Sequence, residues 1–163
     1  MNKQGLTVGL IAVVAVVAAV GAILFSTRHN KVEVKGQVLK VRSHQLSADR
    51  TVVLMDVRLE NPSTQQFMVK DVEVYVDGSD GKPTQADIFS DVDGQRVIDY
   101  YPVLGKKYNP SLIRRDKIAS GKTVDRTLLI NVPISDVQFA ARKGLRIVVQ
   151  DADGPKSEFS EAR

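Results

Sequence analysis

The sequence contains no cysteine and no tryptophan, and its only histidines are His29 and His44. The lack of cysteine excludes disulfides, thiolate nucleophiles and cysteine-ligated metals. No G-x-S-x-G nucleophile elbow accompanies His44, so the sequence gives no support to a serine-hydrolase triad. We therefore expect no catalytic residue, no cofactor and a non-enzymatic function.

Charge is absent from residues 6–25, which read LTVGLIAVVAVVAAVGAILF and also contain no proline. About 20 helical residues rise about 30 Å, which is the thickness of the hydrocarbon core of a bilayer. The run exceeds the ~7–15 apolar residues of a cleaved signal peptide, although the small residues at 19–21 leave cleavage open. We expect a short tail over residues 1–5 and one transmembrane helix over residues 6–25.

Small residues recur four positions apart in and just before this apolar run, a spacing that allows two membrane helices to pack closely. The pairs are Gly5/Gly9, Ala15/Ala19 and Ala18/Ala22. Self-association through the span is therefore one interaction that the sequence allows. An alanine-rich run also produces this spacing by chance.

Basic residues concentrate next to the apolar run. Residues 1–42 hold six Lys and Arg against one Glu, a net charge of +5, whereas the remaining residues hold 17 basic against 18 acidic side chains. A nucleic-acid-binding protein would carry its positive excess on the folded body, so we expect no nucleic-acid partner. The basic stalk over residues 26–42 is expected either to contact anionic lipid headgroups or to act only as a stop-transfer signal. The residues assigned to headgroup contact are Arg28, Lys31 and Lys35.

Beyond the stalk, apolar and polar residues alternate, as expected of strands with one buried face. Gly36 precedes a change of phase that predicts a bulge, and a second change predicts a kink near Lys70. Strands are predicted at residues 31–46, 51–60, 67–77, 124–132, 145–149 and 157–159. Asp-Gly pairs predict turns at residues 77–78, 80–81, 93–94 and 153–154. Strands at this regular spacing indicate a sandwich or a barrel.

One short helix is predicted over residues 136–143. Ser135 and Gln138 have the spacing of a capping box, in which the serine hydroxyl and the glutamine side chain satisfy the first backbone N–H groups. Gly144 is well placed to end the helix, because glycine readily adopts the left-handed conformation that follows a last helical turn.

An Asn-Pro pair interrupts two apolar runs in the segment VRLENPSTQQFMV, residues 57–69. Pro62 has no N–H to donate to a strand ladder, and it keeps Asn61 out of helical geometry, so the strand must end there. We expect the Asn61 side chain to fold back onto the backbone and shape a corner. The chain would then return antiparallel and bury Phe67.

Three short motifs follow one another along the chain: LENP at residues 59–62, VEVYVDG at 72–78, and IASGKTV at 118–124, which leads to LINVP at 129–133. Together they resemble the late-embryogenesis-abundant type 2 (water-stress and hypersensitive-response) domain and a group of bacterial membrane-anchored immunoglobulin-like domains of unassigned role. The resemblance implies a mainly β, immunoglobulin-like antiparallel β-sandwich over residues 32–160, used for binding or envelope protection behind an N-terminal anchor. It implies no catalytic residues.

Residues 84–117 depart from this pattern, because they are longer and more aromatic than a hairpin connection. They are expected to hold either an extra strand pair or a functional loop. Aromatic and arginine residues together are typical of protein interfaces; the competing interpretation is that the rings cover the end of the core. The candidate interaction surface consists of Tyr100, Tyr101, Lys106, Lys107, Tyr108, Arg114 and Arg115.

Two Asp-x-Asp-Gly stretches, at residues 91–94 and 151–154, offer carboxylates that suit Ca²⁺. Neither has the spaced acidic positions, the glycine at the sixth position and the closing glutamate of an EF-hand loop. Hairpin turns are the better interpretation, and we expect no metal site.

These observations predict a single-pass protein of the cell membrane whose β-sandwich acts as a protein-interaction or envelope-associated module. The alternative is a carrier that holds an apolar ligand or lipid in or on the sandwich. The lysine and arginine count favours a cytoplasmic domain, whereas the group that the sequence resembles faces outward. We expect an extracytoplasmic domain, with membrane lipids and an unidentified protein as partners.

Overall fold

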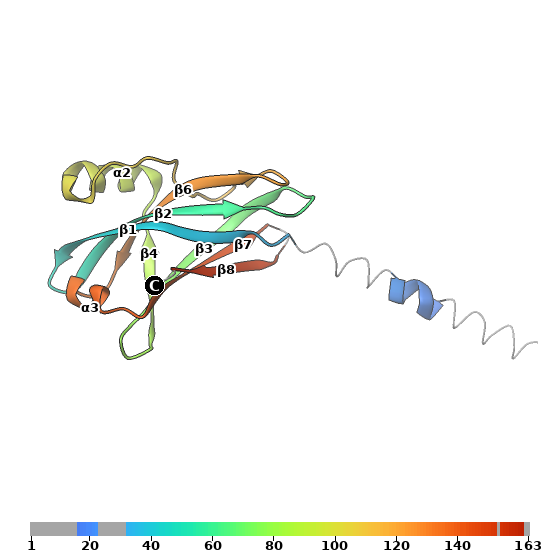
Figure 1. Ribbon diagram of the computed structural model, residues 1–163, viewed down its shortest axis with the longest axis horizontal. Helices are drawn as coiled ribbons and strands as arrows, with labels where there is room; N and C mark the ends of the chain where they lie inside the picture. The colour runs from blue at the N-terminus through green and yellow to red at the C-terminus, as the bar shows by residue number, and fades with distance from the viewer. Residues whose placement is uncertain (1–15, 23–31, 153, 162–163) are drawn as a thin grey trace, which may run out of the picture. The chain divides into compact units, whose positions relative to one another are not determined.

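The computed structural model describes residues 16–22, 32–152 and 154–161. It divides the chain into two compact units, residues 1–31 and residues 32–163. The second unit contains the predicted sandwich domain, and the strands that it forms are labelled in Figure 1.

In the first unit, residues 16–22 are helical and exposed. No helix within the described ranges is long and apolar enough to cross a bilayer. The rest of the predicted span lies outside the described residues, as do the tail over residues 1–5 and the basic residues Arg28 and Lys31. The transmembrane helix and its self-association therefore stay predictions.

The second unit is mainly β, as predicted, and every pair of its strands is antiparallel. Its elements in chain order are β1 (Lys35–Ser47), β2 (Arg50–Glu60), β3 (Phe67–Asp77), β4 (Pro83–Ile88), α2 (Asp91–Tyr100), the 3-10 helix η1 (Pro102–Leu104), β5 (Lys117–Ile118), β6 (Thr123–Val132), α3 (Asp136–Ala140), β7 (Gly144–Asp151) and β8 (Lys156–Ser160). The prediction of one short helix was wrong, since α2 and η1 precede α3.

The strands follow the hydrogen-bonded order β1-β2-β6-β4-β3-β7-β8, and β5 pairs with β3. β4 belongs to both halves of this path: Pro83–Ala86 pair with β3, whereas Asp87 and Ile88 pair with β6. The path therefore folds over at β4 into two layers, β1-β2-β6 and β3-β7-β8, which Figure 1 shows one above the other. The result is a β-sandwich whose layers share one strand.

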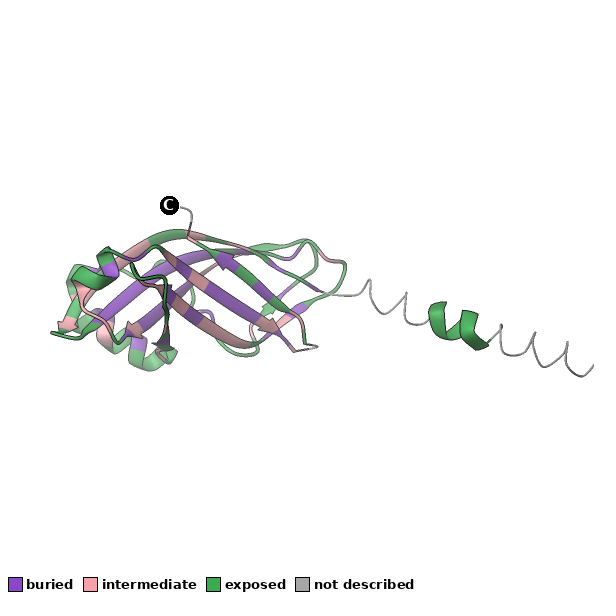
Figure 2. Ribbon diagram, turned by 90° about the horizontal axis from the view of Figure 1, so that it is seen from below, coloured by how far each residue is buried: buried purple, intermediate pink, exposed green. Residues whose placement is uncertain are grey.

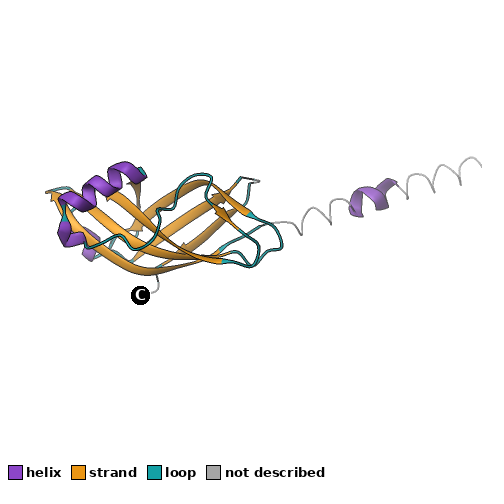
Figure 3. Cartoon of the chain, turned by 90° about the horizontal axis from the view of Figure 1, so that it is seen from above, coloured by secondary structure: helices purple, strands orange, loops and turns teal. Residues whose placement is uncertain are grey.

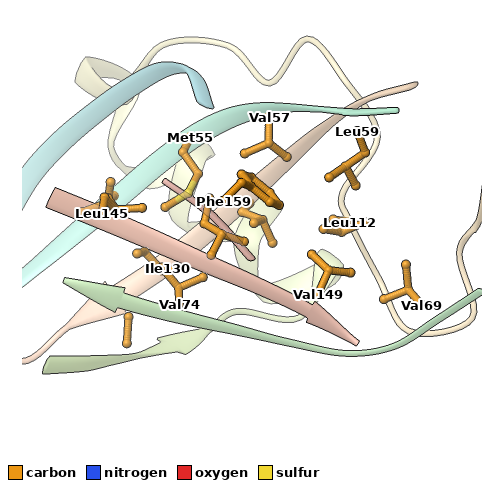
Figure 4. Packing of buried hydrophobic residues seen from close by; sticks show 14 of the residues in the cluster. Met55, Val57, Leu59, Val69, Val74, Leu112, Ile130, Leu145, Val149 and Phe159 are labelled. Carbon is orange, nitrogen blue, oxygen red and sulfur yellow. The ribbon is translucent and has the colours of Figure 1, made fainter. Parts of the chain in front are cut away.

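The core lies between the two layers and is built from the alternating apolar positions of the strands. It includes Val57 and Leu59 of β2 together with Val74, Ile130, Leu145 and Val149 from three other strands. In Figure 4 these side chains point toward one another, and in Figure 2 the buried positions run along the strands. Full burial of one such side chain stabilises a fold by roughly 1.5–3 kcal/mol, so the alternation that predicts the strands also supplies most of the force that holds the layers together.

β4 joins β3 and β6 only at one end of each strand, and residues 109–118 close the remaining opening. Ser111 forms a parallel bridge with Thr127 of β6, and Leu112 is buried in the core. The segment next bonds to the backbone of Val69 in β3, and β5 then pairs with the start of β3. The residues predicted as an extra strand pair or a functional loop thus contain one strand, two helices and this closing segment.

On the opposite side of the sandwich, β1 and β8 approach each other without a ladder. The predicted bulge in β1 is present, but the residue that bulges is Leu39, because the register skips it between Val38 and Lys40. Gly36 has another role: a Cβ there would lie 2.1 Å from Cδ1 of Phe159. The missing side chain at Gly36 leaves the space that the Phe159 ring of β8 occupies.

The second predicted kink is also present, since the register between β3 and β7 shifts between Val69 and Asp71. The bulge leaves Lys70 exposed. Before it, β3 lies between β5, which pairs with Phe67 and Met68, and the end of β7, where the N–H of Ala152 donates to the carbonyl oxygen of Met68.

The corner between β2 and β3 is shaped by Asn61, which is fully buried. Its Nδ2 donates to the carbonyl oxygens of Gln65 (2.7 Å) and Ile118 (3.0 Å), and its Oδ1 accepts from the N–H and the hydroxyl of Ser63. The backbone of Asn61 also bonds to the loop before β6. One side chain therefore joins the corner to β5, which is distant in sequence, and the predicted role of Asn61 is confirmed.

α3 begins with the predicted capping box. The N–H of Gln138 donates to the hydroxyl of Ser135 (3.3 Å), and the Gln138 side chain accepts from the N–H of Ser135 (3.1 Å). The helix ends at Ala140, earlier than predicted, and Gly144 begins β7.

Candidate interaction surface

α2 and η1 form an outer layer over the β1-β2-β6 sheet, on the face that points away from the core (Figure 3). Val52 and Leu54 on this face of β2 are fully buried, in a second apolar cluster with Ile98, Leu104 and Leu129. β2 thus buries apolar side chains on both of its faces. This explains why Leu54 is apolar, although the later residues on the same face of the strand are polar.

The prediction of a hairpin turn at Asp93-Gly94 was wrong, because both residues lie in α2. Ser90 caps the helix by accepting a hydrogen bond from the N–H of Asp93 (3.1 Å). Gly94 faces β6, and a Cβ there would lie 3.5 Å from a methyl carbon of Leu129. The glycine lets the helix pack closely on the sheet.

A shielded ion pair fastens the outer layer to the sheet. Arg42 of β1 and Asp56 of β2 lie 3.0 Å apart, with 15% and 9% of their side chains exposed. Asp56 also accepts from the hydroxyl of Thr127 (2.8 Å), and Arg42 Nη1 donates to the carbonyl oxygens of Leu104 (2.8 Å) and Lys106 (3.0 Å). These bonds hold the backbone of η1 and of the residues after it in one position.

Large apolar side chains stand exposed on this fastened layer. Tyr100 at the end of α2, Val103 in η1 and Tyr108 are 77%, 70% and 71% exposed. Beside them lies a groove of about 510 Å³, lined by α2 residues and by residues between Pro102 and Lys107. We call Tyr100, Val103, Tyr108 and this groove the α2–η1 surface.

The other predicted residues of this layer differ in exposure. Tyr101 is half-buried; its ring centroid lies 5.1 Å from that of His44 and 4.8 Å from that of Tyr100. Tyr101 packs against the outer apolar cluster and not against the end of the core between the two layers. Lys106 is exposed, and Tyr108 lies with its ring centroid 6.0 Å from the guanidinium of Arg42.

Lys107 contributes to the position of α2. Its Nζ lies 2.6 Å from Oδ1 of Asp91 in the first turn of the helix. Hydrogen bonds from Lys107 and from the hydroxyl of Ser111 hold the pKa of the Asp91 carboxyl below its ordinary value. The carboxylate weighed as a calcium ligand is therefore engaged by a cation of the protein.

Arg114 and Arg115 lie apart from the α2–η1 surface, beside β3. Arg114 pairs with Asp71 (2.9 Å), and the N–H of Arg115 donates to the carbonyl oxygen of Val69 (2.7 Å). Arg115 has a φ of 67°, a left-handed conformation that turns the chain toward β3. A second hollow of about 370 Å³ lies next to Arg114. The structure thus separates the predicted surface into two groups.

The described residues include no cluster of three or more His, Asp or Glu side chains that could hold a metal ion. Asp151, the other carboxylate weighed as a calcium ligand, is buried and accepts a hydrogen bond from the N–H of Met68 (2.8 Å). Asp153 lies outside the described residues.

The two larger hollows lie at the surface, while the hollow beneath α2, next to Leu54 and Leu129, measures only about 10 Å³. That volume corresponds to about one water molecule. Core side chains such as Phe67 and Ile147 are fully buried. None of these three hollows is an enclosed cavity large enough for an apolar ligand.

Three residues that shape or belong to this surface were not selected from the sequence: Arg42, Asp56 and Val103. One indication for Asp56 was present in the sequence, since an acidic residue between apolar strand positions suggests a buried partner. It did not identify that partner, because Arg42 lies on another strand. Val103 carried none, since a single valine after a proline has no periodicity.

No family model matches the chain, and no curated protein matches it. Among solved structures, a candidate lipoprotein (ycdA) of Bacillus subtilis is 13% identical with a TM-score of 0.49; the match covers 80% of this chain and 37% of that one. The yjhA protein of the same species is 12% identical, with a TM-score of 0.48 and coverage of 80% and 93%. The archaellum periplasmic stator protein FlaG of Sulfolobus acidocaldarius is 13% identical, with a TM-score of 0.35 and coverage of 78% and 98%.

Proposed function

We propose that this chain is a membrane-tethered, non-enzymatic module that binds a protein partner through the α2–η1 surface. The observation that carries the proposal is the exposure of Tyr100, Val103 and Tyr108 on a layer whose backbone is held by Arg42 and Asp56. Tyrosine is enriched among the residues that dominate binding energy. A backbone that is already fixed loses little conformational freedom when a partner binds.

The finer fold that we propose is immunoglobulin-like. In a constant-type immunoglobulin domain, strands A, B, E and D form one sheet and C, F and G form the other. Strands A to G would correspond, in chain order, to β1, β2, β3, β4, β6, β7 and β8. The observed order then reads A-B-E-D for β1-β2-β6-β4 and C-F-G for β3-β7-β8, which supports the assignment. The motifs shared with the late-embryogenesis-abundant type 2 domain are compatible with the same arrangement.

The tether that we propose is the apolar segment over residues 6–25, with Arg28, Lys31 and Lys35 at the lipid headgroups. Its support is the length and apolarity of the segment in the sequence. We place the domain outside the cytoplasm. Protease added to sealed cells should then remove residues 32–163 while the cells stay intact, and protection of the domain until lysis would reverse this orientation.

Site-specific photo-cross-linking in intact membranes tests the binding function. A photoreactive residue at position 103 should give a discrete adduct with one protein. That adduct should disappear when Tyr100→Ala and Tyr108→Ala are combined, while the same probe at the exposed position Lys82 gives none. An equal set of adducts from positions 103 and 82, unaffected by the tyrosine substitutions, would reject the α2–η1 surface as the binding site.

A further inference from the structure

The sandwich has two chemically different ends. β1, β3, β6 and β8 begin at the same end, and β2 and β7 finish there, because neighbouring strands are antiparallel. We call this the basal end. It also contains the corner at Asn61 and strand β5.

Exposed basic side chains gather at the basal end. Lys35 lies opposite Glu60 in the β1–β2 register, and Glu60 lies opposite Thr123, the residue after Lys122. Lys117 in β5 lies opposite Met68 of β3, two residues before Lys70. Arg115 precedes β5. The basal cluster consists of Lys35, Lys70, Arg115, Lys117 and Lys122, all of which are exposed.

The balance of free charge at this end is positive. None of the five basic side chains of the basal cluster has an ion-pair partner among the described residues. Most of the acidic residues nearby are engaged: Asp116 with Arg126, Asp125 with Arg58 and Asp71 with Arg114. Glu33 and Glu60 are exposed and unpaired within the described ranges. With the buried Asp151 at the end of β7, whose carboxylate accepts from the N–H of Met68, five positive against three negative charges leave +2 among the described residues.

The opposite end has the reverse sign. Its turns and helix ends carry the exposed acids Asp49, Asp80 and Asp87 and the half-buried Asp136, against the exposed bases Arg50, Lys82 and Lys143. The net charge of the residues after position 42 is −1, so the total hides a separation of charge along the domain.

The polypeptide enters the domain at the basal end, because β1 begins there with Lys35. Lys35 lies ten positions after Phe25, the last residue of the apolar segment. An extended chain of that length reaches at most about 36 Å. If the apolar segment is the tether, as proposed above, the basal end is the part of the domain that the chain keeps nearest to the bilayer.

We propose that the basal cluster docks the folded domain onto an anionic lipid surface. Lysine and arginine near such a surface are attracted by its negative potential, and the attraction decays within a Debye length. The polar residues of the corner, Ser63 to Gln66, include no acidic side chain that would oppose the contact. The inference rests on the proposed tether for its geometry and on the folded domain for its charge.

The full chain tests this in vesicles, and its lack of cysteine allows labelling at one introduced thiol. Thr64→Cys places a fluorophore at the basal end, and Ser79→Cys places the same label at the opposite end; both native side chains are exposed. Energy transfer to a headgroup acceptor is measured in neutral phosphatidylcholine and with about 30% phosphatidylglycerol, at low salt and at about 0.5 M salt. Flotation with neutral vesicles reports the tether separately.

The charge variant combines Lys70→Gln, Arg115→Gln, Lys117→Gln and Lys122→Gln. The matched control combines Arg50→Gln, Lys82→Gln and Lys143→Gln at the opposite end. We expect transfer from position 64 to rise with anionic lipid, to fall at high salt, and to be lost in the charge variant alone. We expect position 79 to show no such rise.

Two failures are distinguishable. In the first failure, the chain floats with neutral vesicles, but energy transfer from position 64 is equal in neutral and anionic vesicles, or equal with and without the four charge substitutions. That result overturns basal docking and is compatible with the tether. A chain that does not float with neutral vesicles overturns the tether. In that case basal docking still predicts that the chain floats with anionic vesicles, and that this binding is at least about tenfold weaker in the charge variant. Equal flotation of the charge variant and the control variant would overturn basal docking.

Discussion

At the scale of single residues, Asn61 connects more of the molecule than its position in a corner suggests. Its side chain satisfies two carbonyl oxygens and two groups of Ser63 from a fully buried site. Proline at the next position would end a strand anywhere, but it is the side-chain amide of Asn61 that ties the strand end to Ile118 of β5.

Asn61→Ala should lower the free energy of unfolding by about 3 kcal/mol, because buried groups left without a partner cost about 1–3 kcal/mol each. Urea unfolding followed by circular dichroism measures the change. Thr64→Ala, an exposed substitution in the same corner, is the control. Equal midpoints for the two variants would show that the four bonds contribute nothing net.

Gly36→Ala should lower the free energy of unfolding by about 2 kcal/mol, the typical cost of forcing extra volume into a packed site. The reason is the Phe159 ring, which occupies the position of the missing side chain. In a Phe159→Ala background the same substitution should cost little, because residues in contact are not additive. Additive losses in this double-mutant cycle would contradict the proposed contact.

At the scale of elements, the α2–η1 layer depends on one shielded ion pair. Removing one partner of such a pair is more costly than losing an exposed pair, because the remaining charge stays desolvated. The domain contains both kinds: Arg42–Asp56, and the Arg58–Asp125 pair with 49% and 33% of its side chains exposed.

Arg42→Ala should lower the free energy of unfolding by about 3 kcal/mol. It should also speed amide hydrogen exchange at Leu104 and Gly105, whose N–H groups bond within η1. Arg58→Ala should leave exchange at these two amides unchanged. If the two variants exchange alike, Arg42 does not hold the outer layer.

The strands could be predicted because each has a buried face, and alternation records burial directly. The register bulges at Leu39 and near Lys70 were likewise visible as changes of phase. β4 has only six residues and begins with Pro83, so no alternation identified it. α2 was missed because its Asp93-Gly94 pair is common in turns, although Ser90 at the cap was a visible sign of a helix start.

The candidate surface was predictable only in outline. Clustered aromatic and basic residues located the segment, but exposure depends on tertiary packing, which buries part of Tyr101 and leaves Tyr100 beside it exposed. The separation of Arg115 from Tyr108 follows from the path of residues 109–118 across the edge of the sandwich. No local pattern encodes that path.

At the scale of the whole molecule, acid should destabilise the domain. A hydrogen bond from Tyr75 lowers the pKa of the Glu73 carboxyl, and one from Arg58 lowers the pKa of the Asp125 carboxyl, as Lys107 does for Asp91. A carboxyl whose pKa is lower in the folded state contributes stability above its unfolded value. That contribution is lost as pH falls through the folded value.

The free energy of unfolding should therefore stay constant from about pH 7 to about pH 5 and fall below the ordinary values of 4.5 for Glu73 and 3.8 for Asp125. Urea titrations at a series of pH values measure it. Glu73→Gln combined with Asp125→Asn should make the fall less steep. An unchanged slope in this variant would mean that other carboxyls cause the loss.

The position of β6 has a consequence for synthesis on the ribosome. β2 pairs on one edge with β1, its neighbour in the chain, but Leu54 on its other edge meets Leu129 only after 75 further residues have been added. At roughly 5–20 residues per second, that edge waits about 4–15 s for its partner. During this interval an apolar strand offers unpaired backbone groups to any extended chain nearby, so the nascent protein needs shielding before the finished one does.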